Sequence, residues 1–244
     1  MMIHCSFNWF ALRHVTGSCM RPGGIALTKK AFAVCSLPTD ACVADIGCGV
    51  GGTLEYLDRM GIYRLVGLDC SETFLKEAAC RALSVRFVLG RVETLPFKRA
   101  SFDALFCECV LSALRDRITT LVECSRALKE GGFLIISDIF VRDCSGRSLL
   151  GRKPQVSEAQ DLLTKKDILA CLEDLGFSLV LWEEHKKFLK EFVAHTILAG
   201  LPLLKLQACR QRQGGEKKDP TAISYFLLVA RKRRDIFQPT GKEV

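Results

Sequence analysis

The sequence predicts an α/β protein with a Rossmann-like, seven-stranded, mostly parallel sheet that carries helices on both faces. Two observations lead to this fold class. From residue 40 onward, short apolar runs alternate with helix-like segments. A glycine-rich turn also joins the first of these runs to the helix-like segment after it. With 244 residues, of which 49% are hydrophobic, the chain can bury one large core. We therefore expect a single domain over residues 1–244.

The expected strands and helices follow one another in regular order. The strand candidates are residues 42–45, 64–69, 85–90, 102–107, 132–138, 178–183 and 222–231. The helix candidates are residues 52–60, 71–83, 117–128, 165–175 and 185–207, and a further helix is expected to begin near Thr28. Signals at the ends agree, because Ser71 stands at an N-cap position and glycines follow several helices, at Gly61, Gly131 and Gly176.

The cysteine content indicates a reducing compartment. The thirteen cysteines are an odd number, and they lie inside apolar runs such as residues 106–110. The first ten residues lack the pattern of a signal peptide. The longest apolar region, residues 192–209, contains four interruptions that argue against a membrane span, at His195, Gly200, Pro202 and Lys205. We therefore expect a cytoplasmic protein without a membrane span.

The formal net charge of +8 raises the question of a nucleic-acid partner. Much of the excess lies in the basic run at residues 231–234, which we interpret as part of a solvated tail. The basic residues are not accompanied by the aromatic pattern of a single-strand RNA platform. The sequence therefore predicts no nucleic-acid partner.

The glycine-rich turn identifies the candidate ligand site. Gly47, Gly49 and Gly52 satisfy the dinucleotide fingerprint G-x-G-x-x-G, and Asp69 lies about twenty residues further on, so a nicotinamide dehydrogenase must be considered. Asp45, two residues before the first glycine, argues against it, because a carboxylate there opposes a pyrophosphate. S-adenosylmethionine (SAM) has no phosphate and carries an ammonium and a sulfonium, so an acidic strand end suits it.

Residues 45–49, Asp-Ile-Gly-Cys-Gly, resemble the first motif of the class I SAM-dependent methyltransferases, an acidic residue followed by x-Gly-x-Gly. The resemblance covers residues 25–140 and implies this family's fold and SAM as cofactor. It divides the domain into an N-terminal helical lid at residues 1–38, a SAM-binding core at 39–140, and a remaining half of the sheet at 141–244. The last part contains a helical insertion at 185–220.

The same resemblance implies a set of cofactor-binding residues. The first motif places Asp45, Gly47, Cys48, Gly49 and Gly51 at the cofactor. The family also expects an acidic residue at the end of the second strand. Asp69 supplies it and can accept both ribose hydroxyls, with Cys70 beside it. An Asp that only caps the next helix is the alternative.

Residues 90–97 look like the family's adenine loop, but Arg91 stands where an Asp is common and cannot accept a hydrogen bond. Val92 and Glu93 remain as candidates for the adenine. The Leu-Pro-Phe turn at 95–97, followed by Ser-Phe-Asp, resembles the branch that contains quinone-biosynthesis and arsenite methyltransferases. Residues 126–132 resemble the family's R-x-L-K-x-G-G turn, which is informative for fold and says little about substrate.

The expected acceptor side lies beyond these motifs. The resemblance places Cys107 nearest the cofactor and Glu108 facing the acceptor, as a base or positioning group; a salt-bridged structural carboxylate is the alternative. His185 ends a strand and is a second candidate acid or base, against an exposed helix start. Arg21 can bind an anionic acceptor or belong to a plain turn. Asp138 can help to line the acceptor pocket.

The sequence as a whole predicts transfer of a methyl group from SAM to a small molecule, through catalytic candidates Glu108 and His185. No metal site is expected, because the cysteines show neither a C-x-x-C pair nor zinc spacing. Five cysteines near the site leave arsenite chemistry open as a second acceptor class: Cys48, Cys70, Cys107, Cys109 and Cys144. Two further classes of function stay open, a protein or RNA methyltransferase and a dinucleotide-binding oxidoreductase. The acceptor atom and the oligomeric state stay open as well.

Overall fold

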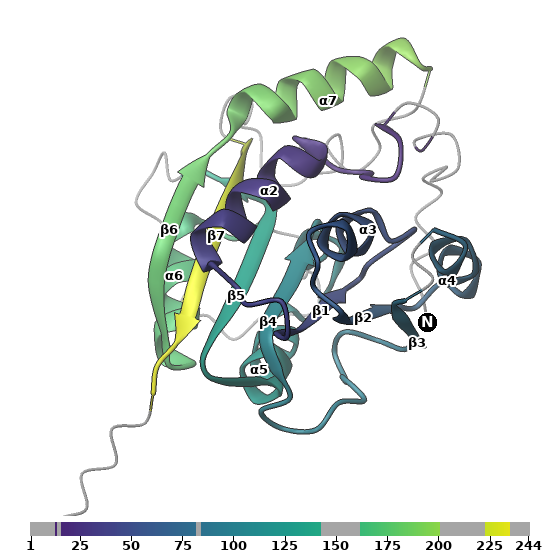
Figure 1. Ribbon diagram of the computed structural model, residues 1–244. Helices are drawn as coiled ribbons and strands as arrows, with labels where there is room; N and C mark the ends of the chain where they lie inside the picture. The colour runs from purple at the N-terminus through teal and green to yellow at the C-terminus, as the bar shows by residue number, and fades with distance from the viewer. Residues whose placement is uncertain (1–12, 14–15, 82–83, 143–161, 201–222, 235–244) are drawn as a thin grey trace, which may run out of the picture.

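The computed structural model describes residues 13, 16–81, 84–142, 162–200 and 223–234 (Figure 1). Its centre is a seven-stranded sheet of order β3-β2-β1-β4-β5-β7-β6. The strands are β1 (Cys42–Ile46), β2 (Arg64–Asp69), β3 (Arg86–Leu89), β4 (Phe102–Glu108), β5 (Leu128–Val141), β6 (Phe177–Glu184) and β7 (Ile223–Lys232). Strand β7 runs antiparallel to its neighbours β5 and β6, and all other pairs are parallel. The predicted fold class is therefore confirmed.

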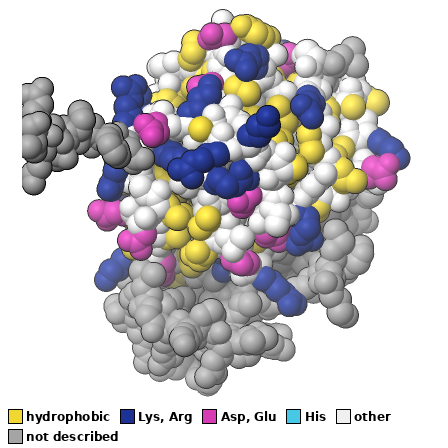
Figure 2. All heavy atoms as spheres, turned by 90° about the horizontal axis from the view of Figure 1, so that it is seen from below, with side chains coloured by type: hydrophobic (Ala, Val, Ile, Leu, Met, Phe, Trp, Pro, Cys, Tyr) yellow, Lys and Arg dark blue, Asp and Glu magenta, His cyan; other side chains and the backbone are white. Residues whose placement is uncertain are grey.

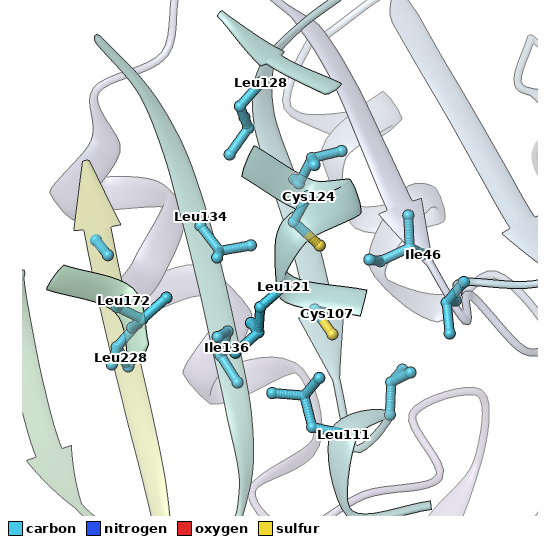
Figure 3. Packing of buried hydrophobic residues seen from close by; sticks show 14 of the residues in the cluster. Ile46, Cys107, Leu111, Leu121, Cys124, Leu128, Leu134, Ile136, Leu172 and Leu228 are labelled. Carbon is cyan, nitrogen blue, oxygen red and sulfur yellow. The ribbon is translucent and has the colours of Figure 1, made fainter. Parts of the chain in front are cut away.

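The helices cover both faces of this sheet (Figure 1). They are α2 (Gly24–Cys35), α3 (Gly52–Arg59), α4 (Glu72–Ala79), α5 (Arg117–Ala127), α6 (Lys165–Asp174) and α7 (Lys186–Leu198), with a short 3-10 turn η1 (Leu111–Ala113). Helices α2, α3, α4 and α7 contribute Leu27, Leu54, Leu75 and Leu189 to the core on one face. Helices α5 and α6 close the core on the other face. Figure 3 shows that core, with Leu121 and Cys124 of α5 packed beside Leu134 and Ile136 of β5.

Three predicted bounds need correction. The helix expected over residues 71–83 ends at Ala79, because the amides of Cys80 and Arg81 donate to carbonyls three residues back and tighten the last turn. The helix expected over 185–207 ends at Leu198, and residues 201–207 lie outside the described part. The strand expected over 132–138 is longer at both ends, since its first residue already pairs with Phe102 and its last residues pair with β7.

The sheet topology brings chemically distinct ends of the strands to one edge. In a parallel sheet the carboxyl ends of the strands lie together, so β2, β1, β4 and β5 all end at the edge that α7 crosses in Figure 1. Strand β6 ends there too, as expected, because it runs parallel to β5 through the antiparallel β7. None of the helices in the described part of the chain combines the length and apolar character needed to cross a membrane.

Candidate active site

The glycine loop between β1 and α3 is folded back on the neighbouring strand. The amides of Gly47 and Cys48 both donate to the carbonyl of Leu68, at 2.7 and 3.0 Å. Gly47 has φ of 75°, and a Cβ atom there would lie 2.5 Å from a methyl group of Val110. Only glycine fits this position, because a side chain would meet both the strained backbone conformation and the neighbouring valine.

Asp69 fastens the same loop from the end of β2. Its carboxylate accepts hydrogen bonds from the amides of Gly49 and Ser71, at 2.9 and 2.8 Å. Burial raises the pKa of Asp69, and these backbone hydrogen bonds oppose the rise. Ser71 itself caps α4 by accepting from the Phe74 amide. The helix-capping alternative therefore belongs to Ser71, while Asp69 ties the second strand to the glycine loop.

Asp45 lies at the end of β1 and is 3% exposed. Among the described residues, none donates a hydrogen bond to its carboxylate. Burial, followed by the nearby negative charge of Glu108, raises the pKa of Asp45 well above its usual value, although the charge of Arg21 acts in the opposite direction. A buried carboxylate without a donor is costly, so this position favours a ligand that brings positive charge.

Glu108 ends β4 and is held from three sides. It pairs with Arg21 at 2.8 Å and accepts hydrogen bonds from Thr53 at 2.6 Å and Thr28 at 3.0 Å. The side chains of Arg21 and Glu108 are 9% and 2% exposed. Burial lowers the pKa of Arg21, but Glu108 and other nearby groups outweigh it and raise the pKa overall. Glu108 is thus salt-bridged in the structure, and its predicted role toward the acceptor stays a prediction.

Residues 18–21, which precede α2, form a strap over the glycine loop. A Cβ atom on Gly52 would lie 2.7 Å from the Ser18 carbonyl oxygen and 2.8 Å from Cys19 Sγ. A Cβ atom on Gly49 would lie 3.4 Å from the end of the Met20 side chain. The strap therefore packs directly on the start of α3, and Arg21 joins it to the end of β4.

The loop after β3 is fixed by α5. Arg126 donates to the carbonyls of Leu95 and Phe97, and Glu123 accepts from the Leu95 amide at 2.8 Å. Sequence reasoning used Arg126 only as a mark of the fold, so this anchoring role was missed. In the loop itself Val92 is buried, and Glu93 pairs with Arg91 at 2.7 Å. Arg91, which stands where the family commonly has an Asp, thus forms an ion pair with a carboxylate two residues away.

The cysteines occupy different environments. Cys107 points into the core beside Leu121 and Cys124 (Figure 3) and is fully buried, which raises its thiol pKa. Its side chain lies on the opposite face of β4 from Glu108, because successive strand residues alternate. This placement does not support Cys107 as the side chain nearest the cofactor. Cys48 is buried in the glycine loop, and Cys70 is exposed after β2.

Every cysteine in the described ranges is a free thiol, and those ranges contain no group of three metal-ligating side chains. Cys144, which was considered for arsenite chemistry, lies outside the described residues. Cys109 instead contacts the hydroxyl of Tyr225 at 3.1 Å, and Tyr225 donates to Ser137 at 3.2 Å. These three contacting side chains connect β7 to the carboxyl ends of β4 and β5. Sequence reasoning missed these contacts, since no motif marks the last strand.

His185 lies at the same edge of the sheet, beyond β7. Its ring stacks on Phe188 and approaches Glu183 at 3.2 Å, and its backbone amide donates to the Tyr225 carbonyl. Burial lowers the pKa of His185, and Glu183 opposes this. Among the described contacts, none joins His185 to Glu108, so the structure does not unite the two predicted catalytic residues. Asp138 accepts from the amides of Ser112 and Ile139, and it anchors the turn after β4.

Comparisons with known proteins agree with this geometry. Residues 44–136 match the family model described as a methyltransferase domain. The chain is 26% identical over 145 residues to an O-methyltransferase, rstn1, of Aspergillus nomiae, covering 57% of this chain and 64% of that protein. It is 34% identical over 118 residues to the uncharacterized methyltransferase YodH of Bacillus subtilis, covering 47% and 50%. The chain thus spans half to just under two thirds of these relatives.

A solved structure extends the likeness of fold. Geranyl diphosphate C-methyltransferase from Streptomyces coelicolor, determined with Mg²⁺, geranyl diphosphate and S-adenosyl-L-homocysteine, superposes with a TM-score of 0.67 at 16% identity. The match covers 86% of this chain and 77% of the other. The fold, the glycine loop and the family match over residues 44–136 are all similar to those of the class I SAM-dependent methyltransferases.

Proposed function

We propose that the chain binds SAM at the carboxyl edge of the sheet and transfers its methyl group to a small-molecule acceptor. The observation that carries the proposal is that the backbone amides of the glycine loop are already hydrogen-bonded. Four of its amides, those of Gly47, Cys48, Gly49 and Gly51, already donate to protein oxygens. A pyrophosphate needs free amide donors at such a loop, so the loop is poorly suited to a nicotinamide dinucleotide.

The charges at this edge fit the parts of SAM. Asp45 offers a buried carboxylate to the ammonium group, and the second lone pairs of Asp69 remain available to ribose hydroxyls. Arg21, next to them, brings positive charge that suits the carboxylate of the amino-acid part. Gly51 lets the loop pack closely on Ala78 of α4, and the resemblance adds Gly49, Cys48, Cys70, Val92 and Glu93 to the proposed cofactor site. SAM supplies a methyl group that the sulfonium already activates, so the chain mainly has to align the two reactants.

We assign Glu108 a positioning role. Its carboxylate oxygens are already engaged by Arg21, Thr28 and Thr53, so they hold these three side chains together. It holds the strap, residues 18–21, against the end of β4 and so keeps the strap over the glycine loop. His185 stays a candidate proton acceptor on the acceptor side, because it ends β6 at the same edge. A small-molecule acceptor is supported by relatives named phosphoethanolamine N-methyltransferase, whereas another relative is named an 18S rRNA methyltransferase.

The proposal is tested by incubating the purified protein with SAM carrying a deuterated methyl group and a cell-free metabolite extract. Mass spectrometry should find a small molecule that gains the labelled methyl group, together with S-adenosylhomocysteine. The Asp45→Asn protein should give neither product, whereas the matched variant Asp40→Asn, at an exposed site before β1, should match the wild type. Label found only in RNA or protein fractions would replace the small-molecule assignment.

A further inference from the structure

Basic side chains gather at the amino-terminal edge of the sheet, opposite the candidate active site. Figure 2 views the molecule from this edge and shows Lys and Arg side chains grouped near the middle of the face. We call the basic edge the set formed by Arg64 at the start of β2, Lys129 at the start of β5, and Arg231 and Arg234 at and after the end of β7. The sequence run 231–234 is therefore not only a solvated tail, since its first two residues belong to β7.

Two arginines of the basic edge converge on one glycine. Arg231 Nε donates to the Gly131 carbonyl at 2.9 Å, and its guanidinium lies 5.3 Å from the centre of the Phe133 ring. A Cβ atom on Gly131 would lie 3.3 Å from Arg234 Nε and 3.7 Å from an outer nitrogen of Arg231. In the described part of the chain no carboxylate forms an ion pair with either arginine. Arg231 is thus held through its Nε and the Phe133 ring, and the outer nitrogens of both arginines have donor capacity to spare.

The edge continues across the sheet toward β2. Lys129 pairs with Asp103 at 2.8 Å, and Arg64 lies near the same carboxylate. From β2 through β1, β4 and β5 to β7 there are four strand spacings, or about 19 Å. Next to Arg64 stands Tyr63, which is 62% exposed and whose amide donates to the Thr39 carbonyl before β1. An exposed aromatic ring therefore lies at one end of a row of cations.

We propose that the basic edge binds the phosphate backbone of a single-stranded nucleic acid, with Tyr63 as a stacking platform for a base. Arginine forks match phosphate oxygens in pairs, and an aromatic ring beside a cationic track is the arrangement that holds single strands. An anionic lipid surface would use the charges but not the exposed ring. A β-strand of six residues is about 20 Å long, so the basic edge and the candidate active site are about that far apart. A nucleic acid bound at the basic edge would therefore not reach the methyl-transfer site, and its role would be to bring the protein to that nucleic acid.

The test is fluorescence polarisation with a labelled single-stranded RNA, measured over a range of salt concentrations. The double variant Arg64→Glu/Arg234→Glu changes exposed side chains. It should bind about 25-fold more weakly at about 0.1 M salt, and its slope of log affinity against log salt should fall by about 1.4, since two phosphate contacts are lost. Tyr63→Ala should weaken binding about tenfold without changing the slope. Thermal denaturation checks that each variant is folded.

The matched control is Lys187→Glu/Lys190→Glu on α7, which makes the same change in net charge on another surface. It should leave RNA affinity within about twofold of the wild type, because exposed charges beyond a Debye length are largely screened. Equal losses in the two double variants would overturn the proposal. So would the absence of RNA binding by the wild type, or binding to vesicles of anionic phospholipid in preference to RNA. None of these outcomes depends on methyl transfer.

Discussion

Arg21 and Glu108 form a buried ion pair, 2.8 Å between Nη2 and Oε2, that joins the strap before α2 to the end of β4. The two residues are far apart in the sequence, and Thr28 of α2 and Thr53 of α3 complete the cluster around the carboxylate. The ion pair and these two hydrogen bonds together join the strap, α2, α3 and β4 around one carboxylate. This arrangement also supports the positioning role that we propose for Glu108.

Breaking this pair from one side should be costly. Arg21→Met leaves Glu108 buried without its cation, so we expect a loss of about 3–5 kcal/mol in the free energy of unfolding. Arg21→Met/Glu108→Gln removes both charges and keeps a group that Thr53 and Thr28 can bind, so it should recover most of that loss. Urea denaturation of the wild type and the variants measures the difference. A double variant no more stable than the single one would contradict a coupled pair.

Asp45 predicts a pH dependence of SAM affinity. Its pKa is raised in the free protein, so a fraction of the carboxyl groups stays protonated well above the usual value of 3.8. The ammonium group of SAM requires the charged form, so affinity should rise as pH increases above the usual pKa of 3.8, until the raised pKa of Asp45 is passed. In Asp45→Asn this rise should disappear. Calorimetric titrations across that range would show it, and a rise of equal size in the variant would assign it to another group.

The same raised pKa has a consequence for stability. In the unfolded chain Asp45 ionises near its usual pKa, whereas the folded protein resists ionisation. The folded state therefore loses stability as pH rises above about 3.8, until the folded pKa is passed. Asp45→Asn should stabilise the free protein, and the gain should be larger at neutral pH than at about pH 4. A gain independent of pH, measured by denaturant unfolding, would argue against a strained carboxylate.

Substitutions at Asp69 and Ser71 should distinguish cofactor binding from helix capping. Asp69→Ala removes the hydrogen bonds to Gly49 and Ser71 and the acceptor for ribose, so SAM affinity should fall by roughly 10- to 100-fold. Ser71→Ala removes only the cap of α4, which should cost about 1 kcal/mol of stability and leave affinity within about twofold. Calorimetry and thermal unfolding on both variants test this. Equal affinity losses would remove the distinction.

The cysteines give a labelling test of where the cofactor lies. Cys70 and Cys80 are both exposed, at either end of α4, but only Cys70 adjoins Asp69. SAM should slow alkylation of Cys70 by a maleimide several-fold and leave Cys80 unaffected. Cys107 should stay unmodified in the native protein, because it is fully buried and its pKa is raised. Peptide mass spectrometry gives the three rates. If SAM protected Cys80 and not Cys70, the cofactor would bind at the other end of α4.

The sequence was most informative where local chemistry decides the structure. The glycine loop, the acidic strand ends and the cap at Ser71 could be predicted, because each depends on a few neighbouring residues. The Arg21–Glu108 pair, the Arg126 anchor and the Tyr225 chain could not, since each joins segments distant in sequence. The role of Cys107 beside the cofactor stays a prediction, and its thiol lies in the core on the face of β4 opposite Glu108.

The central claim is that the carboxyl edge of the sheet binds SAM through Asp45, and isothermal titration calorimetry tests it most directly. Wild-type protein and Asp40→Asn should bind SAM with equal affinity and give no heat with NADH, whereas Asp45→Asn should lose most of the SAM affinity. Tight binding of NADH without heat from SAM, or full SAM affinity in Asp45→Asn, would contradict the account.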